Sequence, residues 1–127
     1  MDVMKTHGAI SWSELMTSDA GKACEFYKGL FGWKIETMPM PQGDYHVVKV
    51  GDTSIAGIMA TPADGPPMPP AWGSYVTVDD VDASAKLAVA LGGTLCAGPM
   101  DIPGVGRFAV IQDPQGAVLN MMTYAAS

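Results

Sequence analysis

Residues that begin or end predicted helices and turns recur in this chain at a fixed spacing. Sixty-one residues separate the members of three pairs that begin or end predicted elements: Asp19 and Asp80, Gly32 and Gly93, and Asp52 and Asp113. The first pair precedes a predicted helix, the second ends it, and the third lies in a late turn. An offset held across several such points indicates two copies of one supersecondary unit. The chain is therefore constrained to folds built from a duplicated module.

Each copy follows the order strand, helix and three strands. In the first copy, alternation and helical spacing predict strands at 10–16, 33–38, 45–50 and 53–59 and a helix at 20–31. In the second, they predict strands at 72–78, 94–97, 107–112 and 117–124, a helix at 80–91 and a loop at 99–106. A proline-rich stretch, 61–71, joins the copies.

The predicted class is therefore α+β, with two tandem βαβββ modules in a single domain over residues 1–127. The modules span about 8–60 and 72–124. Each has a helix on one face of its sheet and a bare opposite face. We expect the two bare faces to form a curved mixed sheet around a shared cleft, with both helices outside.

Composition narrows the classes of partner. The net charge of −6, with only seven Lys and Arg, argues against nucleic-acid binding. No apolar run reaches the roughly 18 residues needed to span a bilayer, and the first residues lack a signal-peptide core. We interpret Cys24 and Cys96 as reduced core thiols of a cytoplasmic protein.

Four motifs, in this order and at this repeat, resemble the vicinal oxygen chelate superfamily of glyoxalases, bleomycin-resistance proteins and extradiol dioxygenases. They are Glu14-Leu15-x-x-x-Asp19, Phe26-Tyr27-x-x-Leu30-Phe31-Gly32-Trp33, Val78-Asp79-Asp80-Val81-Asp82 and Asp113-Pro114-Gln115-Gly116-Ala117. The resemblance covers about residues 8 to 124, and the opening strand looks most like a glyoxalase-like branch.

The resemblance implies one divalent metal held by His, Gln and Glu from four strands, two in each module. The corresponding positions here hold Trp12, Gly73, Asn120 and either Gly57 or Met59. An indole only donates, and glycine offers no side chain. We therefore expect the cleft to persist without the metal and without another cofactor.

Glu14 is the candidate catalytic residue, because it shares a strand face with Trp12 and should point into the cleft. A carboxylate beside an indole in an apolar pocket would have a raised pKa, suited to a general base. The alternative is a buried Glu held by a neighbouring hydroxyl or backbone group. Tyr75 is its repeat equivalent and would bind a ligand or Glu14 itself.

The remaining candidates are ligand contacts: Trp12, Asn120, Met59, Arg107 and His46. Trp12, Tyr75 and Trp72 would stack a flat ligand, unless Trp72 faces the helix side as core. Arg107 would pair with an anionic substrate, or be an exposed edge residue. His46, its repeat equivalent, is either a site residue or structural.

Three functions follow. The first is a metal-independent binder of an apolar or aromatic small molecule. The second is a lyase or isomerase that uses Glu14 as base, or a metal from non-family ligands. The third is a structural dimeric domain without a private ligand. By resemblance we expect a homodimer, and the proline linker would permit exchange of modules between protomers.

Overall fold

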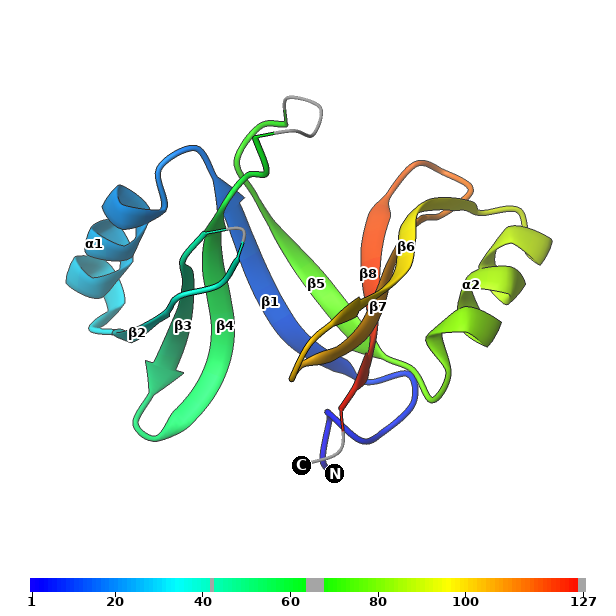
Figure 1. Ribbon diagram of the computed structural model, residues 1–127, viewed down its shortest axis with the longest axis horizontal. Helices are drawn as coiled ribbons and strands as arrows, with labels where there is room; N and C mark the ends of the chain where they lie inside the picture. Colours follow the sequence, from blue (N-terminus) through cyan, green and yellow to red (C-terminus); the bar gives the residue numbers. More distant parts are fainter. Residues whose placement is uncertain (42, 64–67, 126–127) are drawn as a thin grey trace. The chain divides into compact units, whose positions relative to one another are not determined.

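A computed structural model describes residues 1–41, 43–63 and 68–125 of the chain. Its elements follow the predicted order: β1 (Ile10–Thr17), α1 (Ala20–Phe31), β2 (Lys34–Met38), β3 (Tyr45–Val50), β4 (Thr53–Ala60), β5 (Ala71–Thr77), α2 (Val81–Ala90), β6 (Thr94–Ile102), β7 (Gly106–Gln112) and β8 (Val118–Tyr124) (Figure 1). This order confirms the α+β class and the two βαβββ modules.

The chain divides into two compact units, which are described separately. The first unit is Trp12–Trp72, and the second unit is Met1–Ser11 together with Gly73–Ser127. The N-terminal segment therefore packs with the second module: Gly8 donates to the Thr77 carbonyl, and Thr77 donates back to that of Ala9, both at 2.8 Å. The single domain and the shared cleft stay predictions.

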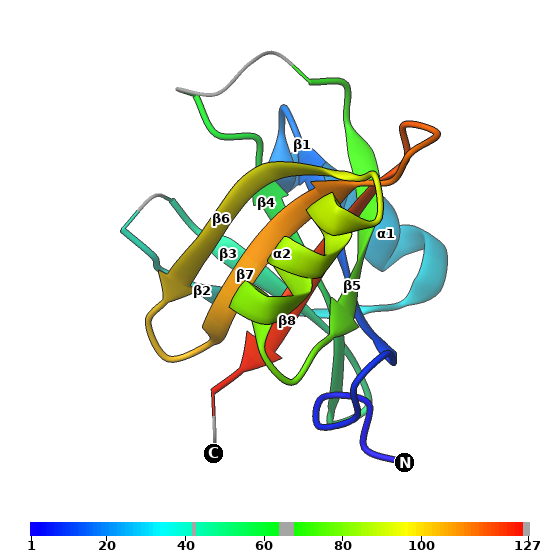
Figure 2. The same ribbon diagram turned by 90° about the vertical axis from the view of Figure 1, so that its right-hand side faces the viewer.

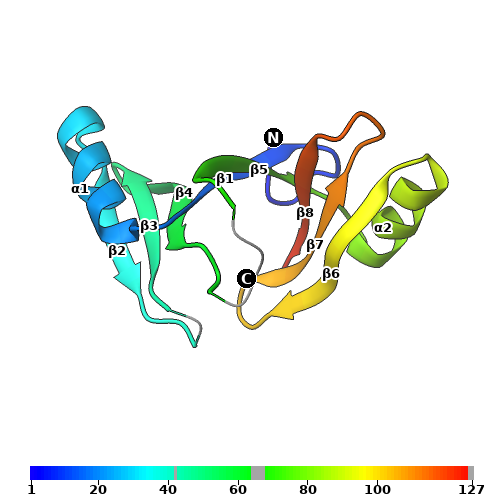
Figure 3. The same cartoon turned by 90° about the horizontal axis from the view of Figure 1, so that it is seen from above.

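The first unit has the strand order β2-β3-β4-β1, in which β1 runs parallel to β4 and the other neighbours are antiparallel. The helix α1 lies along one face of these strands (Figures 1 and 3). Its N-cap is Asp19, whose carboxylate accepts from the Lys22 N–H at 3.0 Å, and Gly32 ends it in the left-handed region. The core beneath the helix is Leu15, Cys24, Val48, Ala56 and Ile58.

The second unit repeats this plan with the order β5-β8-β7-β6, in which β5 is parallel to β8. The helix α2 covers the face of β6 to β8 (Figure 2). Asp80 caps it, accepting from the N–H groups of Asp82 and Ala83. Its core is Val78, Val81, Ala85, Ala109 and Met121.

Two predictions about the second module were wrong. The loop predicted from residue 99 is strand as far as Ile102, because β6 is the edge of its sheet, where a proline costs no ladder hydrogen bond. Cys96 is exposed rather than core, since it falls at an irregularity in the β6–β7 register, between the paired residues Leu95 and Ala97. Cys24 is buried as expected.

The linker prediction is tested only at its ends. Ala71 already belongs to β5, and the Thr61 N–H donates to the Thr17 carbonyl at 3.0 Å. Residues 64–67 lie outside the described part of the chain. Among the described helices, neither is long and apolar enough to cross a membrane.

Candidate functional site

The first unit's sheet presents a polar chain of three side chains on the face away from α1. The Trp12 indole N–H donates to the Tyr45 hydroxyl at 2.9 Å, and that hydroxyl donates to Glu14 Oε2 at 3.0 Å. Glu14 is only 9% exposed. The alternation of β1 explains the placement, because Leu15 points to the helix core and its neighbour Glu14 to the opposite face. The prediction that Trp12 and Glu14 share a face is confirmed.

Gly57 makes room for this arrangement. It pairs with Glu14 on β1 and with Val47 on β3, so the Tyr45 ring crosses its Cα from a diagonal position. A Cβ built on Gly57 would lie 2.7 Å from Tyr45 Cε2, and closer still to the ring's Cζ and hydroxyl. A glycine inside a strand often marks a close approach, and here a tyrosine of the same sheet makes that approach.

Apolar side chains surround the polar chain on the same face. Met59 pairs with Tyr45 and with Met16, and Val47 lies across from Gly57. These three apolar residues are half-buried, so they offer surface without forming a closed core. The face can therefore hold a flat apolar molecule against Trp12 and present it to one oriented carboxylate.

Tyr45 was missed by the sequence reasoning. Two signals pointed to it: a glycine inside β4, and an aromatic residue at the start of the adjacent strand. The register between β3 and β4 was needed to join them, since it sets Tyr45 diagonally across from Gly57.

The second unit places two predicted site residues on neighbouring strands. Tyr75 on β5 pairs with Asn120 on β8, and Tyr75 is only 6% exposed. The Asn120 amide donates to the Ser74 carbonyl at 3.2 Å. The expected approach of Tyr75 to Glu14 joins the two units and stays a prediction.

Arg107 and His46 lie on the helix-side faces of their sheets. Arg107 donates to both carboxylate oxygens of Asp82 on α2, at 2.8 and 3.0 Å, and to Asp101 at 3.1 Å. These hydrogen bonds hold the pKa of the Asp82 carboxyl below its ordinary range and raise that of Arg107. His46 Nδ1 shares a hydrogen bond of 2.8 Å with the Thr37 hydroxyl. Each side chain is therefore engaged on the helix side of its own sheet.

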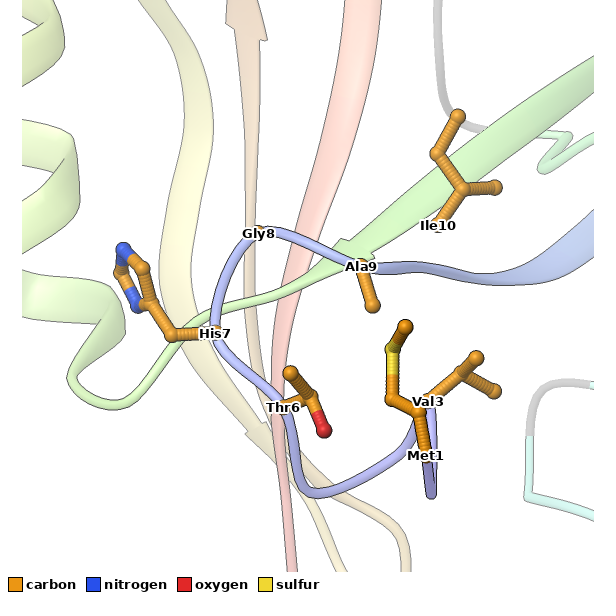
Figure 4. Close-up of a pocket in the computed structure, with 7 residues that line it drawn as sticks. All are labelled: Met1, Val3, Thr6, His7, Gly8, Ala9 and Ile10. Atoms are coloured by element: carbon orange, nitrogen blue, oxygen red, sulfur yellow. The ribbon is translucent and has the colours of Figure 1, made fainter.

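A separate hollow lies at the N-terminal segment of the second unit. It is lined by Met1, Val3, Thr6, His7, Gly8, Ala9 and Ile10. Figure 4 shows Met1 and Val3 beside it, whereas the His7 ring turns away. His7 is engaged elsewhere, accepting from the Asp79 N–H at 2.9 Å. The hollow therefore offers apolar surface and little chemistry.

The metal implied by the resemblance finds no fitting donor set at the corresponding positions. The Trp12 indole donates its only polar hydrogen to Tyr45, and Gly57 and Gly73 have no side chain. Met59, the alternative to Gly57, offers only a thioether sulfur, and Asn120 offers one neutral amide oxygen. Within residues 1–41, 43–63 and 68–125, no three His, Cys, Asp or Glu side chains gather in a group that could hold an ion. These residues do not match the ligands that divalent metals prefer.

Comparison with known proteins agrees with the fold. A 42% identical relative, a Mycobacterium tuberculosis protein with the provisional name glyoxylase CFP32, aligns over 91% of this chain and 44% of its own length. The anthracycline biosynthesis protein DnrV of Streptomyces peucetius is 33% identical over 87% of this chain and 45% of its own. The chain thus spans less than half the length of these curated relatives.

Solved structures share the fold at low identity. Methylmalonyl-CoA epimerase from Mycobacterium tuberculosis superposes with a TM-score of 0.68 at 16% identity, covering 96% of this chain and 92% of the other. The hypothetical protein BH1468 from Bacillus halodurans gives 0.74 at 10% identity, covering 96% and 98%. A family model matches residues 9–121. The chain therefore belongs to the Glyoxalase/Bleomycin resistance protein/Dioxygenase superfamily.

Proposed function

We propose that this chain binds an apolar or aromatic small molecule on the Trp12–Tyr45–Glu14 face, without the divalent metal of the catalytic family members. The hydrogen-bonded chain from the indole through the tyrosine to the carboxylate carries the proposal. It fixes the position of an acceptor beside apolar side chains, on a face that also carries the Glu36–Lys49 ion pair. A ligand with a flat ring and one donor would satisfy both parts of this surface.

The name of one relative agrees with a flat ligand. The Streptomyces peucetius relative is named for anthracycline biosynthesis, and anthracyclines are planar fused-ring molecules that carry hydroxyl groups. Such rings stack on indole and phenol faces, and their hydroxyls can donate to a carboxylate. The glyoxylase name of the mycobacterial relative instead favours an enzyme, which is the second candidate.

Quinizarin, a dihydroxyanthraquinone, is a suitable probe. Its binding should quench tryptophan fluorescence and raise the melting temperature. Glu14→Gln keeps the shape of the side chain but removes its charge, so affinity should fall about 10-fold, the effect of about 1.4 kcal/mol. The matched control is Glu25→Gln, the same substitution at an exposed α1 position paired with Lys28. Equal affinity in wild type and Glu14→Gln would remove Glu14 from the site.

Metal analysis of the purified chain tests the other half of the proposal. We expect far less than one zinc, nickel, manganese or iron per chain, and no change in melting temperature after treatment with EDTA. A stoichiometric metal would refute the metal-free reading.

The second candidate is a lyase or isomerase in which Glu14 acts as the base. It is favoured by the burial of Glu14 and by the Tyr45 hydroxyl that orients one of its oxygens. The test substrate is the hemithioacetal of methylglyoxal and glutathione. Turnover that Glu14→Gln abolishes and Glu25→Gln preserves would establish the enzyme. A chain that neither binds quinizarin nor turns over the hemithioacetal would be the structural domain. We expect all three forms to be cytoplasmic homodimers.

A further inference from the structure

An exposed group of aromatic side chains covers one flank of the first unit. The aromatic face consists of Phe26, Tyr27, Leu30, Phe31, Trp33 and Trp72. Tyr27 lies at its centre, with ring centroids 5.1 Å from Phe26, 5.6 Å from Trp33 and 5.5 Å from Trp72. The Trp72 indole also donates to the Tyr27 hydroxyl at 3.2 Å. The rings thus form one connected patch.

The patch has an inner and an outer layer. Tyr27 and Trp33 are half-buried and pack against the core beneath α1. Phe26, Leu30 and Phe31 are 62%, 58% and 59% exposed. The exposed apolar area of these outer residues and Trp72 is roughly 400–500 Å², as large as the patches that mark interaction sites on monomers. A connected aromatic patch of this size is often a functional interaction surface.

The repeat shows that the module does not need these rings. Positions 61 residues later hold Leu87 for Phe26, Ala88 for Tyr27, Gly92 for Phe31 and Thr94 for Trp33. Cys24 and Ala85 occupy equivalent positions in the two helices, and both are buried. The second module therefore builds the same helix on the same kind of sheet without an aromatic flank. The aromatic face therefore belongs to the first unit alone.

Charge favours a second copy of this chain as the partner. Residues 20–36 carry three lysines and two glutamates, whereas the rest of the chain carries eleven acidic residues and only four basic ones. Two identical chains of net charge −6 repel each other least where this local charge is near zero. Both signs are present beside the rings, as in the Glu25–Lys28 pair at 3.7 Å, so the surface can complement its own copy.

We propose that the aromatic face is the interface through which two copies of this chain associate. In an isologous dimer, each outer layer would cover the other and the lysines and glutamates would form the rim. The apolar centre is about half of the ~800 Å² that each partner buries in a standard interface, and the rim supplies the rest. The proposal names a surface for the expected homodimer and does not depend on the ligand face.

The test measures self-association of the purified chain by sedimentation velocity over a range of concentrations. The disrupting variant is Phe26→Glu with Leu30→Glu, since both positions are exposed on α1. The matched control places the same charges at the repeat-equivalent positions of α2, Leu87→Glu with Leu91→Glu, which are 57% and 72% exposed. Circular dichroism on both variants checks folding.

Wild type should sediment as a dimer of the 13.3 kDa chain, and the α1 variant should associate at least about 100-fold more weakly. The α2 control should stay dimeric. A monomeric wild type, or an α1 variant as dimeric as the control, would overturn the proposal. A second measurement needs no variant: on dilution, amide hydrogen exchange should accelerate at residues 26–34 and stay constant in α2. Unchanged exchange at 26–34 during dissociation would contradict the proposed surface.

Discussion

The contact between Gly57 and the Tyr45 ring predicts that one added methyl group will lower the free energy of unfolding. Gly57→Ala would place a Cβ inside the space of the Tyr45 ring, with Cε2 at 2.7 Å and the outer ring atoms nearer. The atoms in the way belong to a side chain, so the ring would swing aside while the strand stays paired. That movement would break the hydrogen bonds from Trp12 to Tyr45 and from Tyr45 to Glu14.

The magnitude follows from those two bonds. Each contributes about 1 kcal/mol, and a carboxylate that is 9% exposed loses a donor. Against this, replacing glycine by alanine lowers the entropy of the unfolded chain, which stabilises by about 0.4–1 kcal/mol. If the strand moves instead of the ring, overpacking costs about 1–3 kcal/mol. Either route gives a net loss of about 1–2 kcal/mol in the free energy of unfolding.

Urea unfolding followed by far-UV circular dichroism measures this loss directly, and the melting temperature should fall by about 3–5 °C per kcal/mol for a chain of this length. The matched control is Gly29→Ala on α1, where an added Cβ meets no atom within 4 Å. It should be stabilising by up to about 1 kcal/mol, because alanine has the higher helix propensity.

A double-mutant cycle identifies the cause. In a Tyr45→Ala background the three atoms nearest to the added Cβ are gone, so Gly57→Ala should cost much less than in wild type. The reasoning is refuted if Gly57→Ala is as stable as wild type, or if it costs the same in both backgrounds. Quinizarin affinity should fall in the single Gly57→Ala variant together with stability.

Two further predictions concern ionisable groups. Because Arg107 lowers the folded-state pKa of Asp82, their ion pair contributes stability above the carboxyl's ordinary value of 3.8, and this stability is lost as pH falls through the lowered value. Asp82→Asn should therefore melt below wild type at neutral pH and together with it in strong acid; a difference that persists in acid would contradict this assignment. Burial raises the pKa of the Cys24 thiol, whereas Cys96 is exposed, so Ellman's reagent should modify one thiol per chain at least about 10-fold faster than the other. Cys96→Ser should remove the fast phase, and a fast phase that survives would show that Cys24 is accessible.

Local sequence signals predicted most of the fold because they act over short distances. Asp19 and Gly32 mark the ends of α1, and α1 begins and ends at the predicted residues. The predictions failed where the length of a strand depends on its position in the sheet. Pro99 ends a strand by local rules, yet at the edge of the sheet β6 continues through it.

Some residues of the candidate site were also predictable from local signals, and others were not. Alternation along β1 was enough to place Trp12 and Glu14 on one face, because the side-chain period of a strand is fixed by its backbone. Arg107 and His46 were grouped with the site by their repeat spacing, which matches positions but not faces. The structure places both toward the helices.

The sequence by itself determined the duplicated module, its elements and the face on which Glu14 lies, since periodicity and capping are properties of neighbouring residues. Only the tertiary structure decided that Tyr45 reaches across Gly57 to hold Glu14, because that contact depends on the register between separate strands. It also decided that Phe26 and Leu30 stay exposed. Helical spacing shows that apolar residues share a flank, but only packing shows whether anything in the chain covers it.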